Sequence, residues 1–294
     1  MIQLIYLIAL FFSLITNAAD IEFDPSLVRP WRNTLESESL LKDPYIAHHK
    51  NNPHELFYLA SHHQTELKSK TILLVKKLFR TPTFKAVIIE SIPFASGESP
   101  RWFIEDAKQN LKSTYIKGGE SSMAAILANT HSIPLFGGEL DHKDIYDALK
   151  TLKYSDLDIV GFYLARQIPQ WIREKEEKKG LLKRKAPKFL SYYCKKFGIN
   201  SCPRLSQIQA WYQSKNKSKL TSNVTTEQTA PFSDGKLFTQ KISSDLGKIR
   251  DRFTLSLIQS LLNQYKSIAV IYGESHYLTL KKSLDQQLGP AVLF

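Results

Sequence analysis

Two histidines in distant parts of the chain follow apolar segments of similar design. Residues 56–59 and 268–272 are rich in β-branched and aromatic side chains, which is typical of buried strands. A small residue ends each segment, and His63 or His276 follows three positions after it. Polar groups just beyond the carboxyl ends of parallel strands line the crevice in which α/β proteins bind ligands. If the two strands are neighbours, the two imidazoles should face each other across that crevice.

Two carboxylates stand in comparable places. Glu90 ends the apolar segment 84–90, where an unpaired charge would be costly, and Glu120 follows a Gly-Gly break at the start of an expected helix. Imidazole and carboxylate are the usual ligands of transition metals at sites without thiolate, and such a metal can generate hydroxide from bound water. We therefore expect His63, His276 and Glu90 to bind a divalent metal (Mn, Zn, Co or Fe), with Glu90 or Glu120 as a catalytic acid or base.

Each of these residues also has a structural interpretation. A histidine at a strand end is often a hydrogen-bonded structural residue, and Glu90 fits an ion pair equally well. Glu120 could simply favour the N-terminus of its helix through the helix dipole. Arg250 lies in an Arg-Asp-Arg sequence within an expected helix, either on a solvated face or reaching the crevice to stabilise negative charge. The chain has neither a Gly-x-Ser-x-Gly nucleophile motif nor a phosphate-binding glycine loop.

The elements that would position these residues follow an α/β pattern. A strand at 54–60, a helix at 66–79 and a strand at 84–90 predict a βαβ crossover with a parallel pair, after an irregular entry at 21–53. The remaining expected elements are helices at 100–111, 120–130, 141–152, 156–178 and 244–265, and strands at 133–136 and 291–294. We therefore expect an α/β fold with a mostly parallel central sheet flanked by helices.

The middle of the chain differs from this pattern. We expect a single α/β domain spanning 20–294, with a helical basic insertion and a flexible loop at 155–243. The insertion is basic because 173–196 is crowded with Lys and Arg, and the loop is expected at 215–235, which is rich in polar residues. The formal net charge is +12, which favours contact between this insertion and an anionic surface. Without interleaved aromatic residues, nucleic acid is not an expected partner. The sequence leaves the oligomeric state open.

The first 19 residues resemble a secretory signal peptide. Residues 2–15 are almost entirely apolar, and small residues precede Asp20. We expect an exported protein, periplasmic or secreted, with an uncleaved N-terminal anchor as the alternative. In an oxidising compartment Cys194 and Cys202 would form a structural disulfide, whereas a metal site is the weaker interpretation because no histidine lies close by.

The order of these motifs is similar to that of a known group of proteins. The matching segments are 60–63, Glu90, Gly119-Glu120, Arg250-Asp251 and 273–276, with Ala60 where the group has glycine. This pattern resembles the group that includes TraB/PrgY proteins, Tiki proteases, GumN-like proteins, erythromycin-esterase-like enzymes and ChaN-like haem-binding proteins. The resemblance implies metal-dependent proteolysis, ester hydrolysis or haem binding.

Two functions follow from these expectations. The first is an exported metal-dependent hydrolase that acts on a peptide, an ester or an anionic small molecule. The alternative is a protein that binds haem or another metal complex in the same crevice without turnover. Tyr58, Tyr272 and Tyr277 would supply phenol ligands near the histidines, although packing within the core explains them as well.

Overall fold

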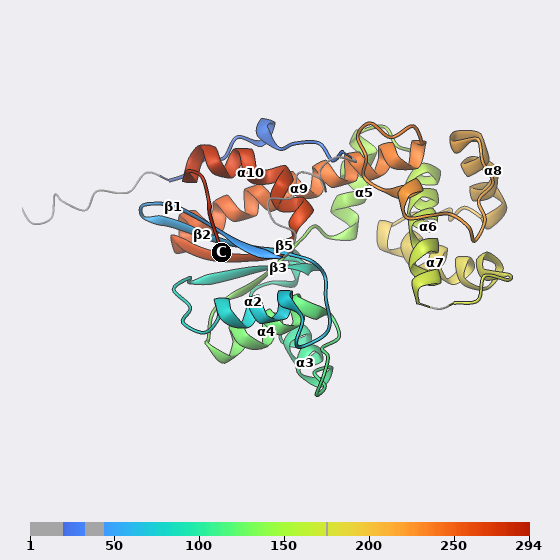
Figure 1. Ribbon diagram of the computed structural model, residues 1–294. Coiled ribbons are helices and arrows are strands. Elements are labelled where there is room, and N and C mark those ends of the chain that lie inside the picture. The colour runs from blue at the N-terminus through green and yellow to red at the C-terminus, as the bar shows by residue number, and fades with distance from the viewer. Residues whose placement is uncertain (1–19, 33–43, 175) are drawn as a thin grey trace, which may run out of the picture.

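The structure is a computed structural model that describes residues 20–32, 44–174 and 176–294 (Figure 1). The predicted signal peptide, residues 1–19, lies outside the described residues. The fold is α/β, as the sequence predicts: one mixed, mostly parallel sheet is flanked by helices. No helix in the described ranges combines the length and the apolar character needed to cross a bilayer.

The sheet has six strands in the order β4-β3-β5-β2-β1-β6. β5 pairs in parallel with β2 and β3, β3 pairs in parallel with β4, and the β1 pairs with β2 and β6 are antiparallel. The strands are β1 (Tyr45–Asn51), β2 (His54–Ser61), β3 (Ala86–Pro93), β4 (Leu135–Glu139), β5 (Ser267–Gly273) and β6 (Val292–Leu293).

Two sequence expectations about the sheet are wrong. Residues 45–51, expected to be irregular, form β1; its histidines and lysine hide the strand pattern, yet His49 is fully buried and its Nδ1 lies 2.8 Å from the Gly289 carbonyl oxygen. In addition, the strands expected to form a direct parallel pair are not hydrogen-bonded to each other. β5 lies between β2 and β3, where its backbone pairs with a strand on each edge and helices on both faces cover its almost wholly buried side chains.

Helices cover both faces of the sheet (Figure 1). One face packs against α2, α3 and α4, and the other packs against α10 and the C-terminal half of α9. The expected helices are present with shifted ends; Ser69 caps α2, so this helix begins later than residue 66. Their bounds are α2 (Lys70–Leu78), α3 (Arg101–Gln109), α4 (Gly119–Thr130), α9 (Phe238–Tyr265) and α10 (Glu274–Leu288).

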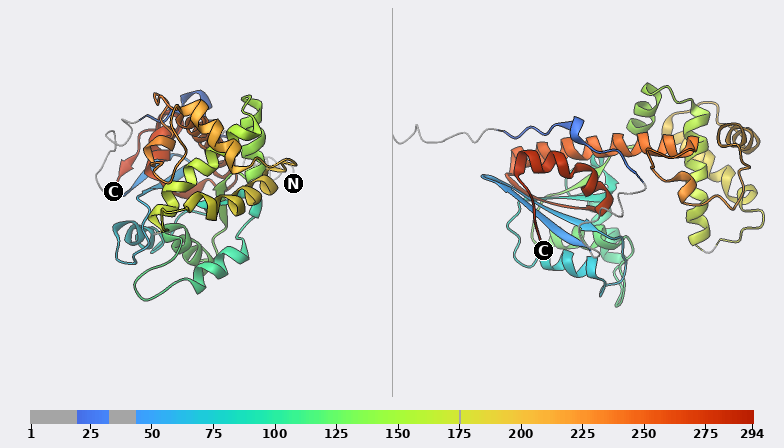
Figure 2. Two further views of the ribbon diagram at one scale, coloured as in Figure 1. Left: turned by 90° about the vertical axis from the view of Figure 1, so that its right-hand side faces the viewer. Right: turned by 45° about the horizontal axis from the view of Figure 1, so that its top comes forward.

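The middle of the chain folds into a helical region with a hydrophobic core of its own, and α9 runs from this region onto the sheet (Figure 2). Asp141 caps α5 as predicted, and Ser155 caps α6 through a reciprocal pair with Asp158. The helices of this region are α5 (His142–Thr151), α6 (Asp156–Arg173), α7 (Leu181–Phe197) and α8 (Leu205–Asn216).

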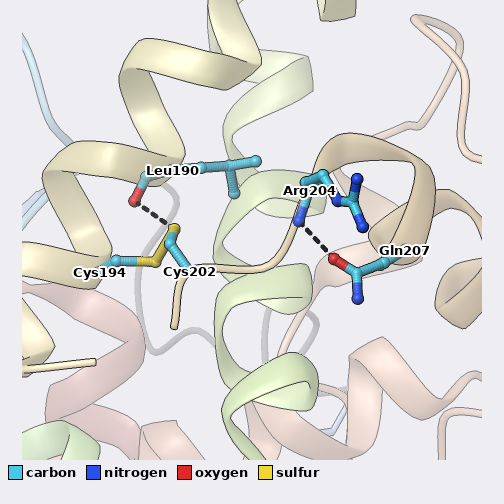
Figure 3. Close-up of a disulfide and its surroundings, with 5 residues drawn as sticks. All are labelled: Leu190, Cys194, Cys202, Arg204 and Gln207. Carbon is cyan, nitrogen blue, oxygen red and sulfur yellow. Dashed lines mark hydrogen bonds between the residues drawn. A yellow bond between two sulfur atoms is a disulfide. The ribbon is translucent and has the colours of Figure 1, made fainter. Parts of the chain in front are cut away.

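The predicted disulfide of this region is confirmed. Cys194, on α7, forms the predicted disulfide with Cys202 in the α7–α8 connection (Figure 3). Residues 215–235, which the sequence predicts to form a flexible loop, make tertiary hydrogen bonds with the start of α9. The side-chain oxygen of Asn216 accepts hydrogen bonds from Thr239, and Gln240 donates to the carbonyl of Glu227.

Candidate functional site

The two histidine segments meet at one end of the sheet. β2 and β5 are parallel neighbours, and Ser61 lies opposite Gly273 in their register. His63 lies two residues beyond the end of β2, and His276 lies in the first turn of α10, which begins directly after β5. The geometry that brings these imidazoles together is therefore the strand pairing that the sequence analysis assumed.

Glu90, near the end of β3, lies between the two imidazoles. Its Oε2 is 3.8 Å from His63 Nε2, and its Oε1 is 3.9 Å from His276 Nε2. The backbone N–H of Gly273 donates a hydrogen bond to the same carboxylate at 3.0 Å. A side chain at Gly273 would occupy the space among these three groups, because a Cβ there would lie 3.5 Å from both Glu90 and His63 and 3.7 Å from His276.

Each imidazole is oriented from behind by a buried carboxylate. Glu120, at the start of α4, accepts a hydrogen bond from His63 Nδ1 at 2.5 Å and another from Ser61. Asp251, on α9, accepts from His276 Nδ1, and Trp31 donates to its second oxygen. When Nδ1 donates in this way, the neutral imidazole carries its free electron pair on Nε2, the nitrogen that faces Glu90.

The two imidazoles differ in access to solvent. The side chain of His63 is 66% exposed, whereas that of His276 is 7% exposed and packs edge-on against Trp31. The hydrogen bond to Glu120 raises the pKa of His63 above its ordinary value. Burial alone would raise the pKa of Glu120, but the hydrogen bond from His63 and its positive charge bring this pKa below the usual value. The pair therefore favours the protonated imidazole beside the ionised carboxylate.

Arg250, on α9, holds the central carboxylate in place. Its guanidinium donates to both oxygens of Glu139, at the end of β4, and to Glu90 Oε1 at 3.2 Å. Tyr272 donates a further hydrogen bond to Glu139 at 2.5 Å. Although burial works in the opposite direction, Arg250 lowers the pKa of Glu139. Arg250 is therefore part of a paired charge network and not on a solvated helix face.

The site opens into a pocket of about 640 Å³ between the sheet and the helical region. His63, Glu90, Arg250 and His276 line it from the side of the sheet, and residues of α6, α7 and the segment before α9 line it from the helical side. Glu120 is buried behind His63 and is not among the lining residues. The predicted site residues thus lie together, with Glu120 one step behind the pocket surface.

A metal must be tested against these donors. Among the residues that the structure describes, no group of three or more His, Cys, Asp or Glu side chains is placed so that it could hold a metal ion. The nearest set by chemistry is His63, His276 and Glu90, each imidazole being backed by a carboxylate as metal-bound histidines usually are. Their separations of 3.8 and 3.9 Å are wider than the ~3.4 Å between two ligands of a tetrahedral metal. The donor types and the space left by Gly273 suit a transition metal, and binding one would bring both imidazoles about 0.5 Å closer to Glu90.

Two important residues of the network, Asp251 and Glu139, have no role predicted from the sequence. Asp251 stood beside Arg250 in a recognised motif, and Glu139 ends β4 as Glu90 ends an apolar segment in β3. Either position was a signal that could have led to them. Ala60, where the resembled group has glycine, is buried in extended strand backbone, so this position does not need the conformational freedom of glycine.

His62 and the three tyrosines predicted as alternative haem ligands do not line the pocket. His62 Nε2 lies 3.0 Å from Glu274, away from the Glu90 centre. Tyr58, Tyr272 and Tyr277 are fully buried and do not line the pocket. They pack within the core, so they lend no support to haem ligation, and the haem alternative stays a prediction.

Comparison with known proteins adds no relative: no protein-family model, curated protein or solved structure matches the chain.

Proposed function

We propose that this protein is a hydrolase that cleaves a peptide or ester bond in the pocket at the end of its sheet. One observation carries the proposal: two imidazoles present their Nε2 atoms to a single carboxylate at the floor of an open pocket, and each is fixed by a carboxylate behind it. Polar groups fixed in this way are prepared to act on water or on a carbonyl group. The resemblance to the TraB, Tiki and erythromycin-esterase-like group agrees with this chemistry.

The proposed cofactor is a divalent metal (Mn, Zn, Co or Fe) held by His63, His276 and Glu90. Such a metal supplies a water of lowered pKa and polarises a carbonyl oxygen. Glu120 and Asp251 accept hydrogen bonds from Nδ1 of the imidazoles, so Nε2 is the nitrogen that would bind the metal after losing its proton. Arg250 and the backbone of Gly273 hold Glu90, which acts either as a ligand or as the base that accepts a proton from water.

The proposed location is outside the cytoplasm. The disulfide between Cys194 and Cys202 supports this, because disulfides persist mainly in oxidising compartments. Two predictions about partners stay predictions: that the basic insertion contacts an anionic surface, and that the protein does not bind nucleic acid.

Elemental analysis of the purified protein and metal titration, followed by assays on p-nitrophenyl esters and a peptide library, test the proposal. We expect one divalent metal per chain and hydrolysis that a chelator removes and metal restores. His63→Ala and His276→Ala should abolish both metal binding and hydrolysis. His62→Ala is the matched control and should keep both, because His62 pairs with Glu274. If hydrolysis resists chelation but disappears in His63→Ala, the metal-dependent mechanism is wrong and His63 acts as a general base. Absence of hydrolysis under every metal condition would refute the proposal.

A further inference from the structure

One face of α6 forms the helical wall of the pocket. Its lining residues recur at helical spacing, so they share one side of the helix. They are Tyr163, Arg166, Gln167, Pro169, Gln170 and Arg173. This wall faces a pocket whose other side carries His63, Glu90 and His276. A substrate that reached the histidines would therefore lie against α6.

The arginines of this wall differ from Arg250 in their pairing. Arg250 contacts the carboxylates of Glu139 and Glu90. Among the described residues, no carboxylate lies within ion-pair distance of Arg166, and Arg173 donates only to the hydroxyl of Thr226, at 3.2 Å. The remaining carboxylate on the pocket wall, Glu227, forms no ion pair with either arginine.

Arg166 presents its charge to the open pocket. Its side chain lies on the pocket wall, is exposed to solvent, and stands near the like charge of Arg250. A guanidinium forms strong paired hydrogen bonds with carboxylate and phosphate oxygens. An anionic ligand in the pocket would form such hydrogen bonds with Arg166, which has no carboxylate within ion-pair distance among the described residues.

We propose that Arg166, assisted by Arg173, binds an anionic group of the substrate, a carboxylate or a phosphate, and so selects substrates that carry such a group near the bond to be cleaved. The aromatic side chains of Tyr163, Phe189 and Tyr193, which pack against one another on the same wall, would contact the apolar part of that substrate. That the bound anion is a substrate rests on the proposed function, but anion binding itself can be tested without turnover.

Calorimetric titration of the whole protein at constant ionic strength tests binding directly. The probes are benzoate and phenyl phosphate, with benzamide as the neutral analogue, and the two anions distinguish a carboxylate site from a phosphate site. We expect one anion to bind at least about tenfold more tightly than benzamide, and Arg166→Gln to lose roughly ten- to a hundredfold of that affinity, as expected for a hydrogen bond between charged groups. Arg166→Lys should retain part of it.

The matched control is Arg184→Gln, which removes the same charge from α7 outside the pocket and should bind like the wild type. Thermal melts verify that each variant is folded. Equal binding of benzamide and both anions to the wild type would overturn the proposal, and so would wild-type affinity in Arg166→Gln.

Turnover separates this inference from the proposed function. For p-nitrophenyl acetate and the p-nitrophenyl monoester of succinate, Arg166→Gln should lower kcat/KM of the anionic ester about tenfold more than that of the neutral one. Hydrolysis of both esters with an unchanged ratio would reject the anion site and leave the proposed function intact. Binding that depends on Arg166, without hydrolysis of any substrate, would reject the proposed function and leave the anion site.

Discussion

The two sides of the pocket treat charge in opposite ways. At the end of the sheet, each charged side chain of the centre is paired: Glu120 with His63, Asp251 with His276, and Glu90 with Arg250. On the helical wall, Arg166 and Arg173 face the pocket without a carboxylate partner among the described residues. Pairing fixes the geometry that chemistry needs, whereas an unpaired cation remains available for a ligand. Under the proposed function, the sheet would supply the reactive groups and the helical region would select the ligands that reach them.

The largest effect should come from the pairing on the side of the sheet. Asp251→Asn would favour the wrong tautomer of His276 and should lower kcat about 10²- to 10⁴-fold while the fold is retained. Ester hydrolysis and a thermal melt measure the two quantities. Glu274→Gln is the control, because it alters a His–carboxylate pair outside the centre. Similar losses of kcat in both variants would show that the effect of Asp251→Asn does not come from its place behind His276.

Removing the cation of this network should destabilise the sheet side. Arg250→Met leaves the carboxylates of Glu90 and Glu139 close together and largely buried without their partner. We expect the free energy of unfolding to fall by about 3–5 kcal/mol, as for other broken buried ion pairs. Urea denaturation measures this change, with Arg166→Gln as the comparison on the helical wall. If Arg166→Gln costs as much, the contrast in pairing between the two walls has no energetic meaning.

The helical region depends on a covalent link that the sheet lacks. Replacing Cys194 and Cys202 by Ser opens a loop with a sequence separation of eight residues and should reduce stability by about 2–3 kcal/mol. Hydrogen exchange should show the loss of protection in α7 and α8, with β2 and β5 unchanged. Uniform loss over the sheet would mean that the two regions unfold together.

The smallest effect is a loss of stability at acidic pH, which should come from His49 in β1 of the sheet. Burial lowers the pKa of His49 below its ordinary value of 6.5, so the unfolded chain takes up a proton before the folded protein does. Stability should therefore fall as the pH decreases below 6.5, by at most about 1.4 kcal/mol per pH unit for this group. Urea titrations at pH 7 and pH 5.5 measure the loss, which should be smaller in His49→Gln. An identical loss in both proteins would assign it to other groups.

Local patterns predicted much of the fold and of the candidate site. Apolar strands followed by small residues indicated the ends at which His63, Glu90 and His276 lie, and helix caps such as Asp141 placed helix starts. The sequence did not predict β1, because the burial of His49 depends on contacts with Gly289 and Tyr277, which are remote in sequence. Composition predicts a flexible loop before α9, but it does not show the tertiary hydrogen bonds that carbonyl groups of this loop accept from Thr239 and Gln240.

The sequence by itself determined the α/β class, the strand ends that carry histidine and glutamate, and the cysteine pair, because each follows from short-range pattern or spacing. Only the tertiary structure decided that β5 lies between β2 and β3, that Asp251 and Glu139 complete the charge network, and that α6 closes the pocket. These features depend on which elements become neighbours. That choice is made by burial of whole faces, and no local window of sequence contains it.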